Sequence, residues 1–230
     1  MKKNRISRAR KRTLNQPDEF VTVSSKILKF VAEHKVVFAS VLGILLAAGI
    51  IIGGICFFSN QAERKAFTML DNVVMKYKAG LKDKGAAEAL QDVNGDFQRI
   101  LDKYARRRGG QLTRVVFANI CFDAGEFDQS IKLYKKAVED FEDRTAIKNL
   151  ALNGLGYAYE AKNEYEAAVG YFEMIASASS PVMKTDAFFN IGRLNDLAGD
   201  MDKSRDAYEK IIIEYPESMY VGLVREKTAR

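Results

Sequence analysis

The chain has 230 residues and a formal net charge of +6, with 47% apolar and 29% charged residues, as in an ordinary globular protein. The charge is uneven, because residues 1–35 hold ten Lys or Arg against three acidic residues, a net of +7. The rest of the chain therefore carries −1. The high pI belongs to the N-terminal arm and does not support a nucleic-acid partner, so we expect none.

Residues 1–35 form a basic arm that we expect to be cytoplasmic. Residues 1–17 are basic and polar and are expected to be disordered. Residues 19–35 mix apolar with basic side chains, which suits two structures equally. They form either an amphipathic helix at the membrane interface or an N-terminal extension of the apolar helix that follows.

Residues 36–58 contain no charged side chain and no polar stripe, which predicts a transmembrane helix. At about 1.5 Å per residue such a helix reaches about 35 Å, enough for a hydrocarbon core of about 30 Å. The run is longer than the core of a typical signal peptide, and no small-x-small cleavage site follows it. Ile55 before Cys56 is too bulky for a lipidation signal.

Charge predicts the orientation of this helix. Seven basic residues lie within residues 2–12, whereas Arg64 and Lys65 after the helix are balanced by acidic neighbours. Because Lys and Arg translocate poorly, the N-terminus should stay in the cytoplasm and the tail should cross, which places it in the periplasm of a Gram-negative cell. Gly49 and Gly53 could pack two membrane helices together, as a homodimer or against a partner, although small residues also recur in apolar spans by chance.

Internal repeats are the most informative feature of the tail. Three turns, Ala124-Gly125-Glu126, Lys162-Asn163-Glu164 and Ala198-Gly199-Asp200, recur at periods of 38 and 36 residues. Each copy has apolar and small residues in a first helix, then a small residue, an aromatic and a small or apolar residue in a second. The copies read Phe117-Ala118, Cys121, Ser130, Tyr134, Ala137; Leu152, Leu155-Gly156, Tyr159, Ala168, Phe172, Ile175; and Phe188, Ile191-Gly192, Asn195, Ser204, Tyr208, Ile211.

This pattern resembles the tetratricopeptide repeat, in which small residues let two helices approach and an aromatic fills the groove beside them. The fold class is therefore predicted as all-α, an α-solenoid behind one transmembrane helix. We expect a degenerate first hairpin at 59–110, with helices near 66–77 and 90–104, three repeats at 111–216, and a capping helix at 217–230 over the last apolar face (Tyr220, Leu223, Val224). Arg106, Arg107 and Arg108 are interpreted as the end of a helix capped by Gly109-Gly110, or as a contact for anionic headgroups or an acidic partner.

Residue chemistry argues against an enzyme. His34 is the only histidine and lies in the arm, which leaves the tail without a Ser-His-Asp, Cys-His or His-based metal site. No Gly-Lys-Ser/Thr follows the glycine pairs, so a phosphate loop is not predicted. Cys56 lies in the predicted transmembrane helix and Cys121 lies in the tail, so the two are not expected to pair. We expect no catalytic residue, no metal and no cofactor.

The first helix of each tetratricopeptide repeat lines a concave groove, and projecting the repeat onto this chain gives candidate protein-binding or peptide-binding residues. These are Val115, Asn119, Phe122 and Asp123; Leu150, Asn153, Tyr157 and Glu160; and Phe189, Arg193 and Asp196. Aromatic rings with amides suit an extended peptide. The alternative is that some rings belong to the core or lie under the C-terminal helix. With Arg193 as its one basic residue, the groove disfavours a clamp for a C-terminal carboxylate and favours a basic or apolar ligand.

A basic arm, one span and about four tetratricopeptide-like hairpins together resemble the ancillary subunit of the SecYEG translocon (the YfgM type). The resemblance implies a scaffold in the bacterial inner membrane that joins the translocon to periplasmic chaperones and exported clients. Its expected partners are therefore proteins, whether translocon subunits, chaperones or clients. The alternative function is a structural or assembly subunit of another envelope complex, such as a pilus, cytochrome-maturation or division complex.

Overall fold

The computed structural model describes residues 19–181 and 183–229, and these ranges contain helices without strands. The expectation of disorder for residues 1–17, and the basic residues among them, lie outside the described residues. The helices are α2 (Glu19–Glu33), α3 (Lys35–Lys84), α4 (Ala86–Tyr104), α5 (Arg108–Asp123), α6 (Phe127–Asp140), α7 (Thr145–Ala161), α8 (Tyr165–Ala176), α9 (Lys184–Ala198), α10 (Met201–Glu214) and α11 (Val221–Thr228). The all-α prediction is confirmed. The chain divides into two compact units, with the boundary between Ser59 and Asn60.

The first unit contains α2 and the apolar part of α3. A turn at His34 separates the two helices, so α2 is an element of its own rather than an extension of the apolar helix. Whether α2 lies at a membrane interface stays a prediction. The apolar stretch of α3 is long enough to cross a bilayer, and its side chains are exposed, among them Val36, Leu42 and Ile50. The described part of the chain thus has one long apolar helix, near the N-terminus.

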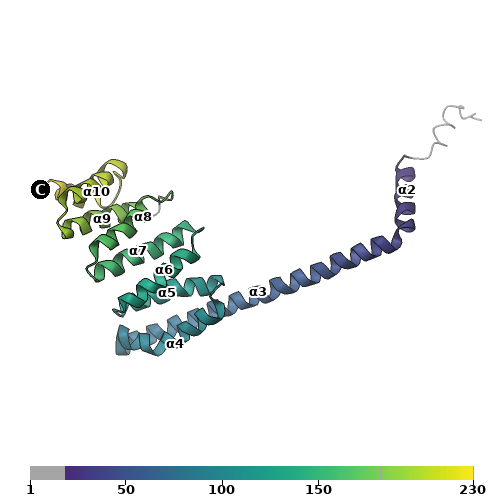
Figure 1. Cartoon of the computed structure of the whole chain (residues 1–230), viewed down its shortest axis with the longest axis horizontal. Coiled ribbons are helices and arrows are strands. Elements are labelled where there is room, and N and C mark those ends of the chain that lie inside the picture. Colours follow the sequence, from purple (N-terminus) through teal and green to yellow (C-terminus); the bar gives the residue numbers. More distant parts are fainter. Residues whose placement is uncertain (1–18, 182, 230) are drawn as a thin grey trace, which may run out of the picture. The chain divides into compact units, whose positions relative to one another are not determined.

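The second unit is a stack of helical hairpins, in which each helix from α4 to α10 packs on the next (Figure 1). The turn inside each of the three predicted repeats has a residue with positive φ: Gly125 at 81°, Asn163 at 62° and Gly199 at 84°. This left-handed conformation favours Gly and Asn. In each turn the following amide closes the helix end by donating to a carbonyl five residues back, at 2.8–2.9 Å (Glu126 to Cys121, Glu164 to Tyr159, Asp200 to Asn195). The predicted turns are therefore confirmed.

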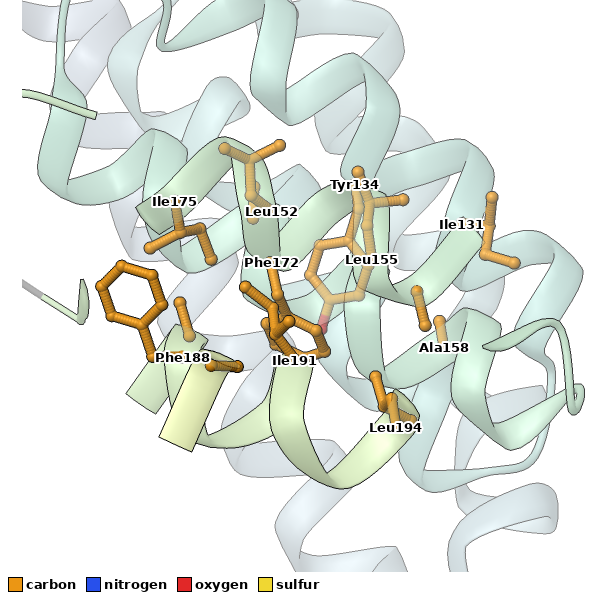
Figure 2. Packing of buried hydrophobic residues seen from close by; sticks show 14 of the residues in the cluster. Ile131, Tyr134, Leu152, Leu155, Ala158, Phe172, Ile175, Phe188, Ile191 and Leu194 are labelled. Atoms are coloured by element: carbon orange, nitrogen blue, oxygen red, sulfur yellow. The ribbon is translucent and has the colours of Figure 1, made fainter. Parts of the chain in front are cut away.

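The repeat motif forms the core of the stack (Figure 2). Phe172 of α8 is fully buried against Gly156 of α7, where a Cβ would lie only 2.5 Å from the ring. Gly192 of α9 leaves room for Tyr208 of α10 in the same way. A buried aromatic or aliphatic side chain of this kind contributes about 1.5–3 kcal/mol. The spacing of small and aromatic residues therefore predicted real contacts between paired helices.

The first hairpin has its own core and joins α3 to α4. Its α3 face repeats at intervals of three or four residues (Ala66, Leu70, Val73, Tyr77), and its α4 face likewise (Leu90, Val93, Phe97, Ile100, Tyr104), with Leu101 only half-buried. Phe97 stacks on Phe117 of α5 with ring centroids 4.6 Å apart, which connects this hairpin to the next repeat. Both predicted helices are present.

The interpretation of Gly109-Gly110 as a helix cap is wrong. α4 ends at Tyr104 and α5 already begins at Arg108, so both glycines lie buried in the first turn of α5. A Cβ on Gly109 would lie 2.7 Å from the Cβ of Ala66, and one on Gly110 would collide with the Tyr104 carbonyl. Gly109 is needed for the close approach of α5 to α3, and Gly110 for the close approach of α5 to the last residue of α4.

Glu63 of α3 caps the N-terminus of α5. Its carboxylate accepts hydrogen bonds from the backbone amides of Gly109, at 2.7 Å, and Arg108, at 3.2 Å. A carboxylate at this place satisfies free amides and complements the helix dipole, each effect worth up to about 1 kcal/mol. The contact ties the turn between α4 and α5 to the start of the second unit.

The C-terminal helix α11 covers the last repeat, but with a different face from the one predicted. Val221 and Val224 are buried, whereas Leu223 is 46% exposed. The prediction that Leu223 belongs to the apolar face is therefore wrong. Two valines three residues apart suffice because the helix has only eight residues.

Candidate peptide-binding groove

Two adjoining hollows, of about 330 and 450 Å³, lie along the first helices of the repeats. Phe122 of α5 and Tyr157 of α7 line both hollows, so the two hollows are neighbours and are treated together as one groove. We call it the α5–α7 groove. Its wall is completed by Asn119, Asp123, Tyr134, Leu150, Asn153 and Gly154 in one hollow, and by Glu160, Ala161, Asn163, Tyr165 and Arg193 in the other.

Eight of the eleven residues predicted for the groove line the two hollows, whereas Val115, Phe189 and Asp196 do not. Val115 is 2% exposed and packs in the core cluster of the repeats, so its assignment to the groove is wrong. The projection placed it by its position in the repeat. At that position the side chain belongs to the core cluster that also contains residues of α6 and α7, which removes it from solvent.

The groove presents apolar side chains beside amides. Leu150 is 45% exposed and Tyr157 is 37% exposed, while Phe122 is half-buried and tilts against Phe127 with centroids 5.5 Å apart. Asn119 and Asn153 stand among them. An exposed apolar surface with fixed amide groups can bury side chains of a ligand and bond its backbone.

Tyr134 of α6 reaches this groove from behind α7. Its hydroxyl donates to the Oδ1 of Asn119, and its ring lies directly against Gly154, where a Cβ would collide with it. Burial raises the pKa of Tyr134 well above its usual value, so the hydroxyl stays a donor. Since Oδ1 is the accepting atom, the amide nitrogen of Asn119 remains available to a ligand.

Arg193 is not a free cation. Its Nη1 and Nη2 lie 2.5 and 2.7 Å from the two carboxylate oxygens of Glu160, and Nη2 also donates to Asn190 at 2.9 Å. The bond with Glu160 raises the pKa of Arg193 further, so the pair stays ionised. The bidentate pair is internally neutral and bridges α7 and α9. It therefore leaves no basic side chain in the hollows to hold a ligand carboxylate.

Asp123 is the carboxylate of the groove for which the described residues supply no ion-pair partner. Partial burial raises its pKa above the ordinary value of an aspartate. Desolvation of this kind disfavours the charged form, and a cation brought by a ligand would compensate it. The electrostatics thus agree with the expectation of a basic or apolar ligand.

The third repeat contributes less to the groove, because the C-terminal segment covers it. Tyr220 stacks on Phe189 with centroids 4.4 Å apart and an interplanar angle of 11°, and its hydroxyl donates to Asp186 at 2.7 Å. This bond to Asp186 raises the pKa of Tyr220 to about 12. Lys227 of α11 lies 3.1 Å from Asp196. Phe189 and Asp196 thus contact the C-terminal segment. For Phe189 this agrees with the alternative that some of the predicted groove rings lie under the C-terminal helix.

Five groove residues were not foreseen: Tyr134, Gly154, Ala161, Asn163 and Tyr165. Three of them surround the turn between α7 and α8, where Asn163 has a positive φ. The sequence marked that turn as a boundary of the repeat and gave no sign that it faces the groove. Tyr134 was predicted as part of the core motif. Because Gly154 has no side chain, the Tyr134 ring passes against it and the hydroxyl reaches the groove.

The described residues contain no group of three or more His, Cys, Asp or Glu side chains placed to hold a metal ion. Cys121 is a buried free thiol, and burial raises its pKa to about 12. A thiol with so high a pKa is a poor nucleophile at neutral pH. Cys121 therefore acts as a small apolar residue in the core.

Comparison with known proteins supports the repeat assignment. Residues 116–182 and 186–218 match two models of the tetratricopeptide repeat. This part of the chain therefore consists of tetratricopeptide repeats, a scaffold that mediates contacts between proteins and is generally non-catalytic. A search of the curated proteins gave no match.

Solved structures share the fold. Two crystal structures of the "putative kinesin light chain nearly identical TPR-like repeats" of Podosopora anserina are 12% identical to this chain, with TM-scores of 0.50 and 0.51. Each alignment covers 66% of this chain and 75% of the other. BtubC (BKLC) from P. vanneervenii is 13% identical over 68% of this chain and 74% of its own, with a TM-score of 0.47. At 12% identity the likeness to the two Podosopora anserina structures is one of fold alone.

Proposed function

We propose that this chain is a membrane-anchored adaptor that binds an extended segment of another protein in the α5–α7 groove. The observation that carries the proposal is that exposed Leu150 and Tyr157 line the same hollow as the amides of Asn119 and Asn153. Hairpin 59–110, repeats 111–216 and cap 217–230 would act together as the scaffold that holds this groove in shape.

The chemistry of the groove defines its ligand. Apolar side chains of the ligand would lie on Phe122, Leu150 and Tyr157, and its backbone would bond the asparagine amides. A Lys or Arg of the ligand would face Asp123. A C-terminal carboxylate is a poor ligand, because Arg193 is already held by Glu160 at two oxygens.

The apolar helix supports the second part of the proposal, membrane anchoring. Residues 36–58 would span the bilayer once, with the N-terminus in the cytoplasm and the tail in the periplasm, since the basic residues precede the span. Gly49 and Gly53 have no other side chain within 4 Å of where a Cβ would lie. That surface is open to a second helix, in a homodimer or against a partner.

The architecture of arm, span and repeat tail is the basis for proposing an inner-membrane adaptor between the Sec translocon and periplasmic chaperones or exported clients. Tethering the groove beside an exit site raises its effective concentration for emerging chains, so a weak affinity would suffice. Translocon subunits, chaperones and clients are accordingly the proposed partners. Membership of another envelope complex, such as a pilus or division complex, is the competing function.

Site-specific photocrosslinking in cells tests this proposal. A photoreactive amino acid at Leu150 or Tyr157 should capture secretory or chaperone proteins. The matched control is the same amino acid at Ile213, which is 75% exposed on α10 and lies outside the groove. Capture at Ile213 equal to that at Tyr157 would contradict binding in the groove. Selective capture at Tyr157 of subunits from a different envelope machine would support the competing function instead.

A further inference from the structure

Four exposed cations adjoin, in the sequence, the point where α5 contacts α3. Arg106 and Arg108 lie at the turn into α5, and Arg64 and Lys65 adjoin Glu63, which caps that helix. We call these four residues the basic cluster. All four are exposed. Arg107 lies between two of them but has an interaction of its own, so it is left out.

Several other cations of the second unit form ion pairs, and the basic cluster does not. Lys76 pairs with Asp96 at 2.8 Å, Arg193 with Glu160 at 2.5 Å and Lys227 with Asp196 at 3.1 Å. Within the described residues, no ion pair involves any member of the basic cluster. Its positive charge is therefore available to an external anion.

Two packing contacts hold the turn of the basic cluster against the start of the second unit. The carboxylate of Glu63 bonds the amides of Arg108 and Gly109, and Gly109 lies so close to Ala66 that even a methyl group would not fit. Residues 106–108 are therefore fixed beside residues 63–66, although more than forty positions separate them in the sequence.

Glu63 follows the last apolar residue of the uncharged stretch, Phe58, by five positions. Five residues reach about 8 Å as a helix and at most about 18 Å when fully extended. The headgroup layer of a bilayer is about 5–8 Å deep on each side of the hydrocarbon core. If residues 36–58 span the membrane, Arg64 and Lys65 lie close to the headgroups, and Glu63 holds the turn at residues 106–108 beside them.

We propose that the basic cluster binds the phosphates of anionic phospholipids. This proposal rests on the membrane anchor proposed above and is independent of ligand binding in the groove. Arginine presents a planar fork of donors that matches phosphate oxygens, and two of the three arginines lie on one short turn. Each basic residue near an anionic surface adds about fivefold to the equilibrium for contact. An acidic protein is a weaker candidate. The proposed membrane anchor places the bilayer beside the basic cluster, whereas no feature of the chain places an acidic protein there.

Hydrogen exchange of the full-length chain in lipid nanodiscs tests the proposal. One set of discs contains phosphatidylcholine alone, and the other an equal mixture of phosphatidylcholine and phosphatidylglycerol. Amides of residues 104–112 should exchange at least about threefold more slowly in the anionic discs. High salt should remove this difference because it screens surface charges.

Two variants make the test specific. Arg106→Gln with Arg108→Gln should abolish the difference between the two lipids, since it removes the charge and leaves the backbone that Glu63 caps. Lys132→Gln with Arg225→Gln, two exposed cations on α6 and α11, should leave the difference intact. Circular dichroism melting in the same discs verifies that both variants fold.

Each outcome has a definite meaning. Equal exchange in the two lipids, in a chain that is stably incorporated, overturns the lipid contact and leaves the anchor in place. A chain that does not incorporate into discs overturns both the anchor and this proposal. Loss of the lipid effect in both variants would show a general attraction of the positive chain and would also overturn a specific role for the cluster.

Discussion

The concave faces of α7 and α9 occupy equivalent positions in two consecutive repeats and have opposite fates. On α7, Leu150 and Tyr157 are exposed to the groove. On α9, Phe189 lies under Tyr220, and Asp196 is paired with Lys227. The last repeat of a stack has no following repeat to shield it, so a capping segment takes that place. Equivalent positions in a repeat therefore do not imply equivalent functions.

The largest contrast expected between the two faces is in stability. Phe189→Ala should lower the free energy of unfolding by about 2 kcal/mol, because it removes a ring stacked on Tyr220. Leu150→Ala should lower it by less than about 1 kcal/mol, since that side chain is already largely in solvent. Denaturant unfolding of the chain in detergent, followed by circular dichroism, measures both. Equal losses would mean that α11 does not cover α9 in solution.

A smaller contrast should separate two tyrosines at the same repeat position. Tyr134 donates to Asn119, whereas the buried hydroxyl of Tyr208 finds no partner in the described residues. Tyr134→Phe should therefore cost about 1 kcal/mol, and Tyr208→Phe should be neutral or stabilising, because it removes an unsatisfied polar atom. The same unfolding measurement tests this pair. A clear loss in Tyr208→Phe would point to a bound water or ligand on that hydroxyl.

The smallest expected effects concern two aspartates, and they should have opposite signs. Burial raises the pKa of Asp123 in the folded state above its unfolded value. The ionisation of Asp123 therefore lowers the free energy of unfolding of the protein as the pH rises from the unfolded-state pKa to the folded-state pKa. Asp123→Asn should accordingly be more stable than the parent chain at neutral pH and equal to it well below the unfolded pKa of about 3.9. Thermal melting at acidic and neutral pH measures the difference.

Asp196→Asn is the matched control on the covered face. It removes the ion pair with Lys227 and should lower stability at neutral pH by about 0.5 kcal/mol, as is usual for partly exposed pairs. A destabilised Asp123→Asn would show that Asp123 has a cationic partner in solution, and the proposed site for a basic ligand residue would then be occupied.

Much of the fold could be predicted from local pattern. The turns at Gly125, Asn163 and Gly199 and the pairs Gly156–Phe172 and Gly192–Tyr208 follow from short-range spacing within one hairpin. The groove was predicted less completely. Asn119, Leu150 and Tyr157 were found by projecting the repeat, but the same projection assigned the buried Val115 to the groove. Projecting the repeat onto the sequence predicts the direction in which a side chain points. It does not show how closely a neighbouring helix packs, and so it could not show that Val115 is buried.

The sequence by itself determined the helical class, the repeat register, the uncharged stretch of 23 residues and the absence of histidine from the tail. These follow from periodicity and composition, which are properties of a local stretch of sequence and do not depend on tertiary contacts. Only the tertiary structure decided that Glu63 caps α5, that Gly109 admits Ala66, and that Tyr220 covers Phe189. Each of these contacts joins residues more than thirty positions apart, so it depends on how the hairpins stack and not on the pattern within any one of them.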